Sequence, residues 1–217
     1  MARLLVLDLD GTLVDSSRDI AAALDAALQR LVPGTAPIPL ERVLDFVGEG
    51  ARLLIERSLE HASLALPVDE VLAVYLDCYR ERLLDTTRLY PGMAEALAAL
   101  GPAGPALAEL TNKPGDSSRT ILEGLGVADR FARILGAGDV PARKPDPAGL
   151  LALLYQLGIP AAEAWMVGDS ATDVHTGRAA GVRVAGVAWG FHPAGLRAAG
   201  PDRILDDPLG LVRLAAA

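Results

Sequence analysis

The sequence predicts an α/β fold in which a doubly wound parallel sheet carries an inserted all-helical domain. Three observations point to it. An apolar strand pattern at residues 4–7 opens the chain and ends in acidic residues. A long stretch with helical spacing follows, and from residue 91 helix and strand patterns alternate, which is typical of βαβ units. The expected division is a core of residues 1–15 and 89–217 and a helical insertion of residues 16–88.

Composition and charge exclude several classes of protein. The chain has 217 residues, of which 51% are hydrophobic and 22% charged, as in a globular domain rather than a disordered one. Its formal net charge of -8 argues against nonspecific binding to nucleic acid or an anionic membrane, since both need a basic surface. No apolar run approaches the length of a membrane span. The single cysteine, Cys78, rules out an internal disulfide and predicts a cytoplasmic protein.

The opening strand, residues 4–7, is apolar on both sides, which predicts a strand buried on both faces of a parallel sheet. Asp8 and Asp10 follow it, and their side chains leave an extended chain on the same side. Gly11 then allows a turn. Paired acids at a strand's carboxyl end can hold Mg²⁺ while one of them attacks as a nucleophile. Alternatively, they only cap backbone amides in a turn, and this stretch alone does not decide between the two.

The stretch from Val14 to Tyr90 shows helical spacing and no strand pattern. Ser16 and Asp19 form a possible capping box at the start of the first helix. Gly48-Glu49-Gly50 interrupts the helices, and such a loop usually connects helices but can also reach over a substrate. The expected helices span residues 20–31, 40–46, 51–62 and 67–85.

The second part of the chain alternates between helices and short strands. The expected helices cover residues 93–100, 117–125, 147–157 and 173–180, with one more at the end of the chain, and the expected strands cover 106–110, 133–135, 164–167, 183–188 and 203–205. Because the carboxyl ends of parallel strands meet at one edge of a sheet, the residues that follow these strands are expected to share a site with Asp8 and Asp10.

Those residues carry the chemistry of a phosphoryl-transfer site. Asp169 and Asp173 follow one strand, Thr111 another, and Lys144 lies in a loop. Asp8, Asp10, Asp169 and Asp173 would repel one another unless a cation neutralised them, and oxygen donors favour Mg²⁺. Only Lys113 and Lys144 among the 20 basic residues are lysines, and both lie in proline-containing loops, which favours a role at the site. Lys144 and Thr111 could clamp a phosphoryl group.

Four motifs occur in order along the chain: DLDGTLVDS at residues 8–16, TNKP at 111–114, KPDP at 144–147 and GDSATD at 168–173. Less specific strings are VGEGARLL at 47–54, YPGM at 90–93 and WGFHP at 189–193. Together they resemble the haloacid dehalogenase superfamily on its phosphatase side, and within it bacterial phosphoglycolate phosphatases. The resemblance covers nearly the whole chain and implies a Rossmann-like core with a helical cap.

The resemblance also implies roles for individual residues. Asp8 would attack phosphorus and become an aspartyl phosphate, and Asp10 would act as general acid and then as general base. Mg²⁺ would be held by Asp8, the Asp10 backbone carbonyl and Asp169, supported by Asp173. Lys113 matches only weakly, and a position facing solvent is the alternative to a role at the site. The positions that match phosphate-binding ones are Thr111, Asn112 and Lys144, with Thr12 close enough to help.

The expected function is that of a Mg²⁺-dependent phosphatase for a small phosphorylated metabolite, with 2-phosphoglycolate favoured and the protein a monomer or homodimer. Gly48, Glu49, Gly50 and Arg52 are expected to contact the substrate from the cap. The alternatives are a β-phosphoglucomutase-like sugar phosphomutase and a phosphatase for another sugar phosphate such as N-acetylmuramic acid 6-phosphate. A phospho-accepting signalling domain is a non-enzymatic alternative, against which the long insertion argues.

Three features fall outside this pattern. Glu109 lies where a buried strand normally has an apolar residue, so either a polar neighbour is present or the strand register differs. Tyr75 and Tyr79 are expected in the core rather than at a ligand. The three histidines of the chain are assigned no catalytic role.

Overall fold

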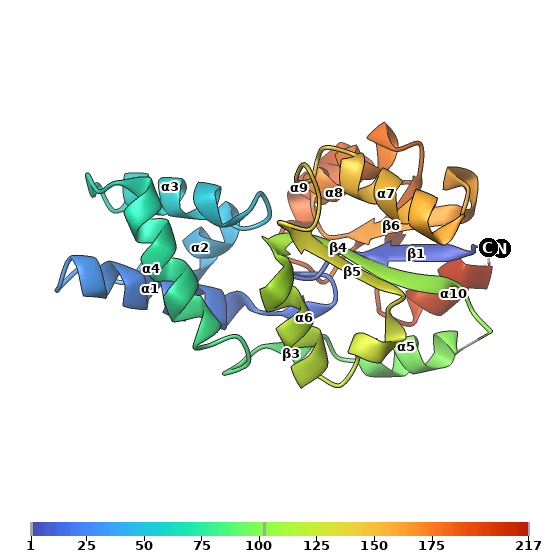
Figure 1. The fold of residues 1–217 in the computed structure, drawn as a ribbon, viewed down its shortest axis with the longest axis horizontal. Coiled ribbons are helices and arrows are strands. Elements are labelled where there is room, and N and C mark those ends of the chain that lie inside the picture. The colour runs from blue at the N-terminus through green and yellow to red at the C-terminus, as the bar shows by residue number, and fades with distance from the viewer. Residues whose placement is uncertain (1, 102, 217) are drawn as a thin grey trace.

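The computed structural model describes residues 2–101 and 103–216, and its centre is a six-stranded parallel sheet (Figure 1). The strand order is β5-β4-β1-β6-β7-β8, so the chain crosses over the sheet as a doubly wound fold does. The α/β prediction is therefore confirmed. The strands are β1 (Leu4–Leu7), β4 (Ala106–Pro114), β5 (Arg133–Ala137), β6 (Ala164–Gly168), β7 (Arg183–Val187) and β8 (Arg203–Leu205).

Strand β1 lies in the middle of the sheet, between β4 and β6. Leu5 is aligned with Leu107 on one side and Trp165 on the other. All four residues of β1 are fully buried, because neighbouring strands flank it and helices cover both faces. The strand therefore holds the residues that follow it, starting with Asp8, at the centre of the sheet's carboxyl edge.

Helices cover both faces of the sheet and bury a separate apolar cluster against each. Leu5 and Leu7 of β1 belong to one cluster, and Leu4 and Val6 belong to the other, as the alternation of side chains along a strand requires. The first face carries α5 (Met93–Leu100), α6 (Gly115–Gly124) and α10 (Gly210–Ala216), and the second carries α7 (Ala148–Leu157), α8 (Ala171–Ala179) and α9 (Pro193–Ala199).

Four further helices form the helical insertion, which lies beyond the carboxyl ends of the strands (Figure 1). They are α1 (Ser17–Leu31), α2 (Leu40–Phe46), α3 (Ala51–His61) and α4 (Val68–Arg80). The first three match the predicted spans to within a few residues. The prediction for the fourth is wrong at its end, because the chain leaves the helix at Arg80 and turns through the residues that follow.

A short antiparallel ribbon connects the insertion to the core. Strand β2 (Val14–Asp15) pairs with β3 (Arg88–Leu89), so that Val14 faces Leu89. The prediction that no strand occurs between Val14 and Tyr90 is therefore wrong at both β2 and β3. Two residues are too few to show an alternating pattern, so this ribbon could not be predicted from the sequence.

The predicted capping box at Ser16 and Asp19 is also wrong. Ser16 makes no side-chain cap to helix α1, and its hydroxyl donates to the carboxylate of Asp10 instead. The Asp19 carboxylate accepts hydrogen bonds from the backbone nitrogens of Thr86 and Thr87, at 2.9 and 2.8 Å, and from both hydroxyls. Burial raises the pKa of Asp19, but these donors lower it below its ordinary value. Asp19 thus ties the two ends of the insertion together.

Two more differences from the predicted elements affect the site. Strand β4 continues past Leu110 to Pro114, because its pairing with β5 resumes after an irregularity in the register. Thr111, Asn112 and Lys113 therefore lie on a strand and not in a loop. The short helix α9 was not predicted. None of the helices in the described ranges is both long and apolar enough to cross a membrane.

Candidate active site

Three carboxylates meet at the carboxyl edge of the sheet. Asp8 follows β1 directly, Asp169 follows β6, and Asp173 lies in the first turn of α8. Each of them offers an oxygen within 4.8 Å of the others, and all three residues are buried. Three of the four carboxylates predicted to cluster thus lie together, whereas that of Asp10 is not part of the group.

Lys144 lies among these carboxylates. Its Nζ is 2.9 Å from Asp8 Oδ1 and 2.7 Å from Asp173 Oδ1, and its side chain is 2% exposed. One ammonium against three carboxylates leaves a buried net charge of minus two when all are ionised. Burial raises the pKa of Asp8 to about 6, although Lys144 lowers it, and burial with the charge of Asp173 raises the pKa of Asp169. The three carboxylates therefore carry more negative charge than the single Lys144 ammonium neutralises.

The oxygens of the three carboxylates differ in their hydrogen bonds. Asp8 Oδ1 also accepts from the Leu9 nitrogen at 2.8 Å, and Asp169 Oδ2 accepts from the Phe191 nitrogen at 2.7 Å. Asp173 Oδ2 accepts from the nitrogen and hydroxyl of Ser170, at 3.2 and 2.7 Å. No described residue donates to Asp8 Oδ2 or Asp169 Oδ1. Asp8 and Asp169 each retain a free oxygen, whereas both oxygens of Asp173 are engaged.

Glycines let the backbone approach Asp169 closely. A Cβ atom at Gly11, whose φ is +78°, would lie 2.3 Å from Asp169 Oδ2, and one at Gly190 would lie 2.2 Å from Asp169 Cβ. Side chains at these positions would push Asp169 away from Asp8. The donor set is all oxygen, is negatively charged overall and has free oxygens, and it fits a hard divalent cation such as Mg²⁺.

Asp10 is bound by Lys113 rather than facing the three carboxylates. Lys113 Nζ lies 2.6 Å from Asp10 Oδ1 and 2.8 Å from Oδ2, and the Ser16 hydroxyl donates to Oδ1 as well. Lys113 is buried, so the alternative that it faces solvent is wrong. Its Nζ also lies 4.7 Å from the centre of the Tyr79 ring, which belongs to α4 of the insertion.

Asn112 has a different environment from the one expected for a phosphate-binding side chain. Its Nδ2 donates to the Gly48 carbonyl at 3.0 Å and to the Lys144 carbonyl at 2.9 Å, while its Oδ1 accepts from the Lys144 nitrogen at 2.8 Å. Asn112 therefore holds the backbone of Lys144 and a loop of the insertion. Thr111 Oγ1 accepts from the Lys113 nitrogen at 3.2 Å, and the buried Thr12 Oγ1 has no partner among the described residues.

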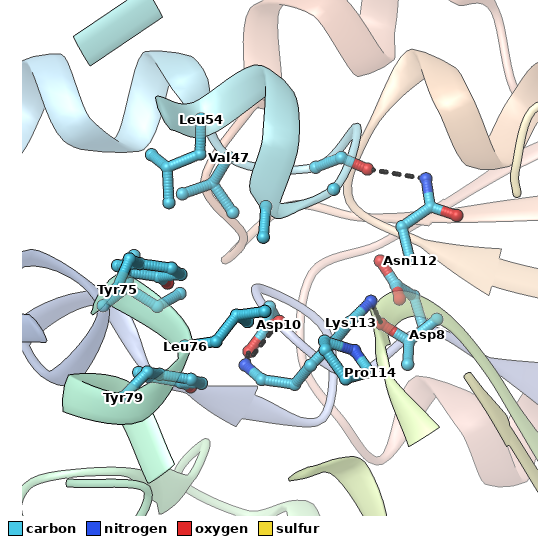
Figure 2. A pocket seen from close by; sticks show the side chains of 15 residues that line it. Asp8, Asp10, Val47, Leu54, Tyr75, Leu76, Tyr79, Asn112, Lys113 and Pro114 are labelled. Atoms are coloured by element: carbon cyan, nitrogen blue, oxygen red, sulfur yellow. Dashed lines mark hydrogen bonds and ion pairs between the residues drawn. The ribbon is translucent and has the colours of Figure 1, made fainter. Parts of the chain in front are cut away.

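A pocket lies between the sheet edge and the insertion (Figure 2). Its cavity volume is about 60 Å³, which is room for roughly five water-sized groups. Asp8, Asp10 and Lys113 are on the sheet side, and Tyr75 and Tyr79 are on the insertion side. The two tyrosines are buried as predicted, yet they also line the pocket. The other lining residues are Ile20, Val47, Gly48, Gly50, Ala51, Leu54, Leu76, Thr111, Asn112 and Pro114.

The loop before α3 supplies only part of the predicted substrate contacts. Gly48 and Gly50 line the pocket, whereas Glu49 and Arg52 do not. Arg57 Nη2 lies 2.5 Å from Glu49 Oε1, and Arg52 pairs with Asp69 and Glu56 on the insertion itself. These ion pairs keep both charged side chains within the insertion.

His192, to which the sequence assigned no role, holds the same loop from the core side. Its Nε2 lies 3.0 Å from the Val47 carbonyl oxygen, next to the point where Asn112 binds the Gly48 carbonyl. The loop is thus held at two successive carbonyls by two core side chains. An isolated histidine carries no pattern from which this contact could have been predicted.

Comparison with known proteins identifies the family. A family model described as haloacid dehalogenase-like hydrolase matches residues 5–187. The chain belongs to this family of hydrolases. It is 39% identical to a phosphoglycolate phosphatase of Rhodospirillum rubrum over 214 residues, which cover 95% of this chain and 88% of that protein. It is 37% identical to a phosphoglycolate phosphatase of Psychrobacter arcticus over 218 residues, with 97% and 94% covered.

Solved structures agree with the fold of this haloacid dehalogenase-like hydrolase. A predicted phosphoglycolate phosphatase from Haemophilus somnus superimposes with a TM-score of 0.91 at 30% identity, covering 98% of this chain and 97% of that one. The similarity therefore extends over the sheet, its covering helices and the helical insertion together.

Glu109 is a buried acid that the site of this hydrolase does not use. The register places it between Leu7 and Ile134, so the alternative of a different strand register is wrong. It is fully buried, and neither carboxyl oxygen meets a hydrogen-bond partner among the described residues. Burial, together with the negative charge of Asp8, raises the pKa of Glu109 well above its ordinary value.

Glu109→Gln is expected to stabilise the protein at neutral pH. As the pH rises above the ordinary range of glutamate, the unfolded chain loses the proton while folded Glu109 keeps it, so the free energy of unfolding falls. The variant removes this loss, so its free energy of unfolding should exceed that of the wild type by about 2 kcal/mol at pH 7.5 but by almost nothing at pH 4.5. Urea unfolding at both pH values measures this, with exposed Glu123→Gln as the control. An equal gain at both pH values would contradict it.

Proposed function

We propose that the protein is a Mg²⁺-dependent phosphatase that hydrolyses a small phosphate monoester through an aspartyl phosphate on Asp8. The observation that carries this proposal is the carboxylate of Asp8 at the edge of the pocket. Its Oδ1 is held by the Leu9 nitrogen and the Lys144 ammonium, and its Oδ2 is free. A carboxylate so oriented can attack, because one oxygen is fixed and the other is unoccupied. The names of the relatives support the hydrolysis of a phosphate monoester.

Two displacements at phosphorus complete the reaction. Asp8 Oδ2 forms a bond to phosphorus, and the bond from phosphorus to the ester oxygen breaks. Asp10, free of Lys113 and carrying a proton taken from water, gives that proton to the departing oxygen. Water then transfers a proton to Asp10 and attacks the same phosphorus. The bond to Asp8 breaks, inorganic phosphate leaves, and the Asp8 carboxylate is restored.

The surrounding residues stabilise charge and position. The Lys144 ammonium neutralises part of the carboxylate charge and lies where it can contact phosphoryl oxygens, and Thr111 is placed to donate to them. Mg²⁺, held by Asp8, Asp169 and the Asp10 carbonyl, would supply positive charge to the phosphoryl oxygens when bound. Asp173 orients Lys144 and supports the metal indirectly, since both of its oxygens are engaged. Asn112 keeps the Lys144 backbone in place.

The helical insertion is proposed to act as the cap, with residues 16–88 forming the specificity wall and residues 1–15 and 89–217 the catalytic core. The pocket is lined from both parts, and its small volume favours a compact substrate. The favoured substrate is 2-phosphoglycolate, which the names of the relatives also support. The single cysteine, buried and unpaired, favours a cytoplasmic location.

Phosphate release from a panel of esters tests this function. The panel contains 2-phosphoglycolate, glucose phosphates and N-acetylmuramic acid 6-phosphate, each with Mg²⁺. We expect kcat/KM for 2-phosphoglycolate to exceed the others by about 100-fold, or about 2.7 kcal/mol. A preference for N-acetylmuramic acid 6-phosphate would make that ester the substrate in place of 2-phosphoglycolate. Conversion of a sugar phosphate to its isomer without phosphate release would point to a mutase, and no reaction with any compound would contradict the proposal.

Removal of the metal is expected to abolish turnover. With EDTA, kcat should fall by about 1000-fold or more, because the buried negative charge at Asp8 and Asp169 then opposes an anionic substrate. Added Mg²⁺ should restore full activity. Activity that survives exhaustive chelation would contradict the metal assignment while leaving the nucleophile in place.

A further inference from the structure

Lys113 is the single cationic side chain among the described residues that line the pocket. Its side chain is 5% exposed, and its ammonium is held by both oxygens of Asp10, at 2.6 and 2.8 Å. Of the arginines near the loop, Arg52 pairs with Asp69 and Arg57 pairs with Glu49. Arg143 lies beside Gly50 and makes no ion pair with a described residue, but it is exposed and does not line the pocket. A ligand anion in this pocket, outside the phosphoryl site at Lys144, therefore has one cation to bind.

Apart from the acids Asp8 and Asp10, the other polar lining groups are uncharged, namely the side chains of Tyr75, Tyr79, Thr111 and Asn112, so none of them can neutralise an anion. Leu54, Leu76 and Val47 are apolar, and the side of Lys113 away from Asp10 lies against the Tyr79 ring (Figure 2). A carboxylate placed against such a wall without a partner would lose its hydration with nothing to replace it. Binding to Lys113 avoids that loss.

The same contact occupies Asp10. While Lys113 and Ser16 bind its carboxylate, Asp10 is not free to contact the ester oxygen that it is proposed to protonate. A ligand anion that takes over the Lys113 ammonium would release Asp10 for that contact. Recognition of the ligand and release of the acid–base group would then be one exchange of partners.

We propose that Lys113 is a specificity-determining residue that binds a carboxylate of the substrate and, in doing so, releases Asp10. The inference rests on the proposed phosphatase function and names its substrate class. Lys113 Nζ and the ester oxygen would each lie one hydrogen bond from Asp10, and the carboxylate would lie one more from Lys113, so the carboxylate must lie within about 8 Å of that oxygen. Phosphate esters of 2-hydroxy and 3-hydroxy acids meet this condition.

The test compares two substrates of the same shape. 2-Phosphoglycolate carries the carboxylate. Isobutyl phosphate has an uncharged isopropyl group in its place, with a methyl group where each carboxylate oxygen was. For the wild type we expect kcat/KM to favour 2-phosphoglycolate by about 100-fold, and for Lys113→Met we expect that ratio to fall at least 30-fold. KM for 2-phosphoglycolate should rise because its carboxylate loses its partner, and the difference in kcat between the two substrates should disappear because Asp10 is then free with either of them. Lys113→Arg should retain part of the preference.

Arg80→Met is the matched control, because Arg80 follows Tyr79 on α4 and is exposed, with its ion pair directed to Asp77. Its substrate ratio should equal that of the wild type. A folded Lys113→Met enzyme with an unchanged ratio would overturn the inference while leaving the phosphatase function intact. A wild type that hydrolyses both esters equally would overturn it as well.

Binding provides a readout that does not depend on turnover. In an Asp8→Asn background with Mg²⁺, calorimetry should show that Lys113→Met weakens 2-phosphoglycolate binding at least tenfold and leaves inorganic phosphate binding within about twofold. Equal weakening of both ligands would mean a structural role and would overturn the inference. If the wild type released phosphate from no ester, the proposed function would fail, and this measurement would still test Lys113 separately.

Discussion

Asp8→Asn is expected to lower kcat by about 10⁴-fold or more for every substrate. The amide has the shape of the carboxylate, so its oxygen can still accept from the Leu9 nitrogen, but the amide nitrogen cannot attack phosphorus and carry the phosphoryl group. The substitution also removes one of three crowded negative charges. The fold should therefore persist, and the loss should lie in the chemical step.

Initial rates and acid-quenched mass spectrometry measure this loss. The wild type should gain the mass of one phosphoryl group during turnover, and the variant should not. Asp129→Asn, an exposed change on the core, is the control and should keep full activity. Residual turnover of the variant within tenfold of the wild type would remove Asp8 as the nucleophile and with it the aspartyl phosphate.

Lys144→Met has the second large expected effect, and it acts on stability as well as on rate. Without the ammonium, Asp8, Asp169 and Asp173 lack a counter-charge within the described structure. Leaving such charges unpaired should lower the free energy of unfolding in EDTA by about 3 kcal/mol. Mg²⁺ should recover part of this loss, because binding to the folded state stabilises it. Activity should fall roughly 1000-fold.

Urea unfolding with EDTA and with Mg²⁺ separates these effects. The neighbouring exposed residue provides the control: Arg143→Met removes a cation that makes no ion pair with any described residue, and its stability should match the wild type in both buffers. A Lys144→Met protein that is as stable as the wild type in EDTA would mean that the carboxylates are not held by this ammonium.

Much of the core fold follows from local sequence patterns. The apolar run of β1 and the alternation after residue 91 were sufficient to predict a parallel sheet, because buried strands and crossover helices each have their own periodicity. The ribbon of β2 and β3 was not predictable in this way. It depends on pairing between residues more than seventy positions apart, and each strand has only two residues.

The site was predictable to the extent that its residues follow strands. Asp8, Lys144, Asp169 and Asp173 come together because the sheet places the ends of β1 and β6 and the loop after β5 side by side. The pairing of Lys113 with Asp10 was missed, since the direction of a long side chain depends on its neighbours in space. The same limit applies to Asn112, whose amide binds backbone groups from two distant loops.

Charge patterns on the insertion were less informative. Glu49 and Arg52 lie close to the glycines that line the pocket, yet each forms an ion pair within the insertion. The sequence does not reveal which acidic residue a surface arginine pairs with. Glu109 shows the opposite case. Its burial was visible from the strand pattern, but its lack of partners depends on α6 and β5, which pack against it.

The ribbon that joins the insertion to the core bears on how such enzymes change over evolution. Val14 and Leu89 face each other, and paired residues of antiparallel strands lie about 5 Å apart. Any segment whose two ends meet at that spacing could replace residues 16–87 without altering the ribbon or a strand of the main sheet. On the proposed division of roles, the catalytic groups of the core and the insertion that selects the substrate could then be inherited independently, and exchange of the insertion would give an enzyme for a new substrate.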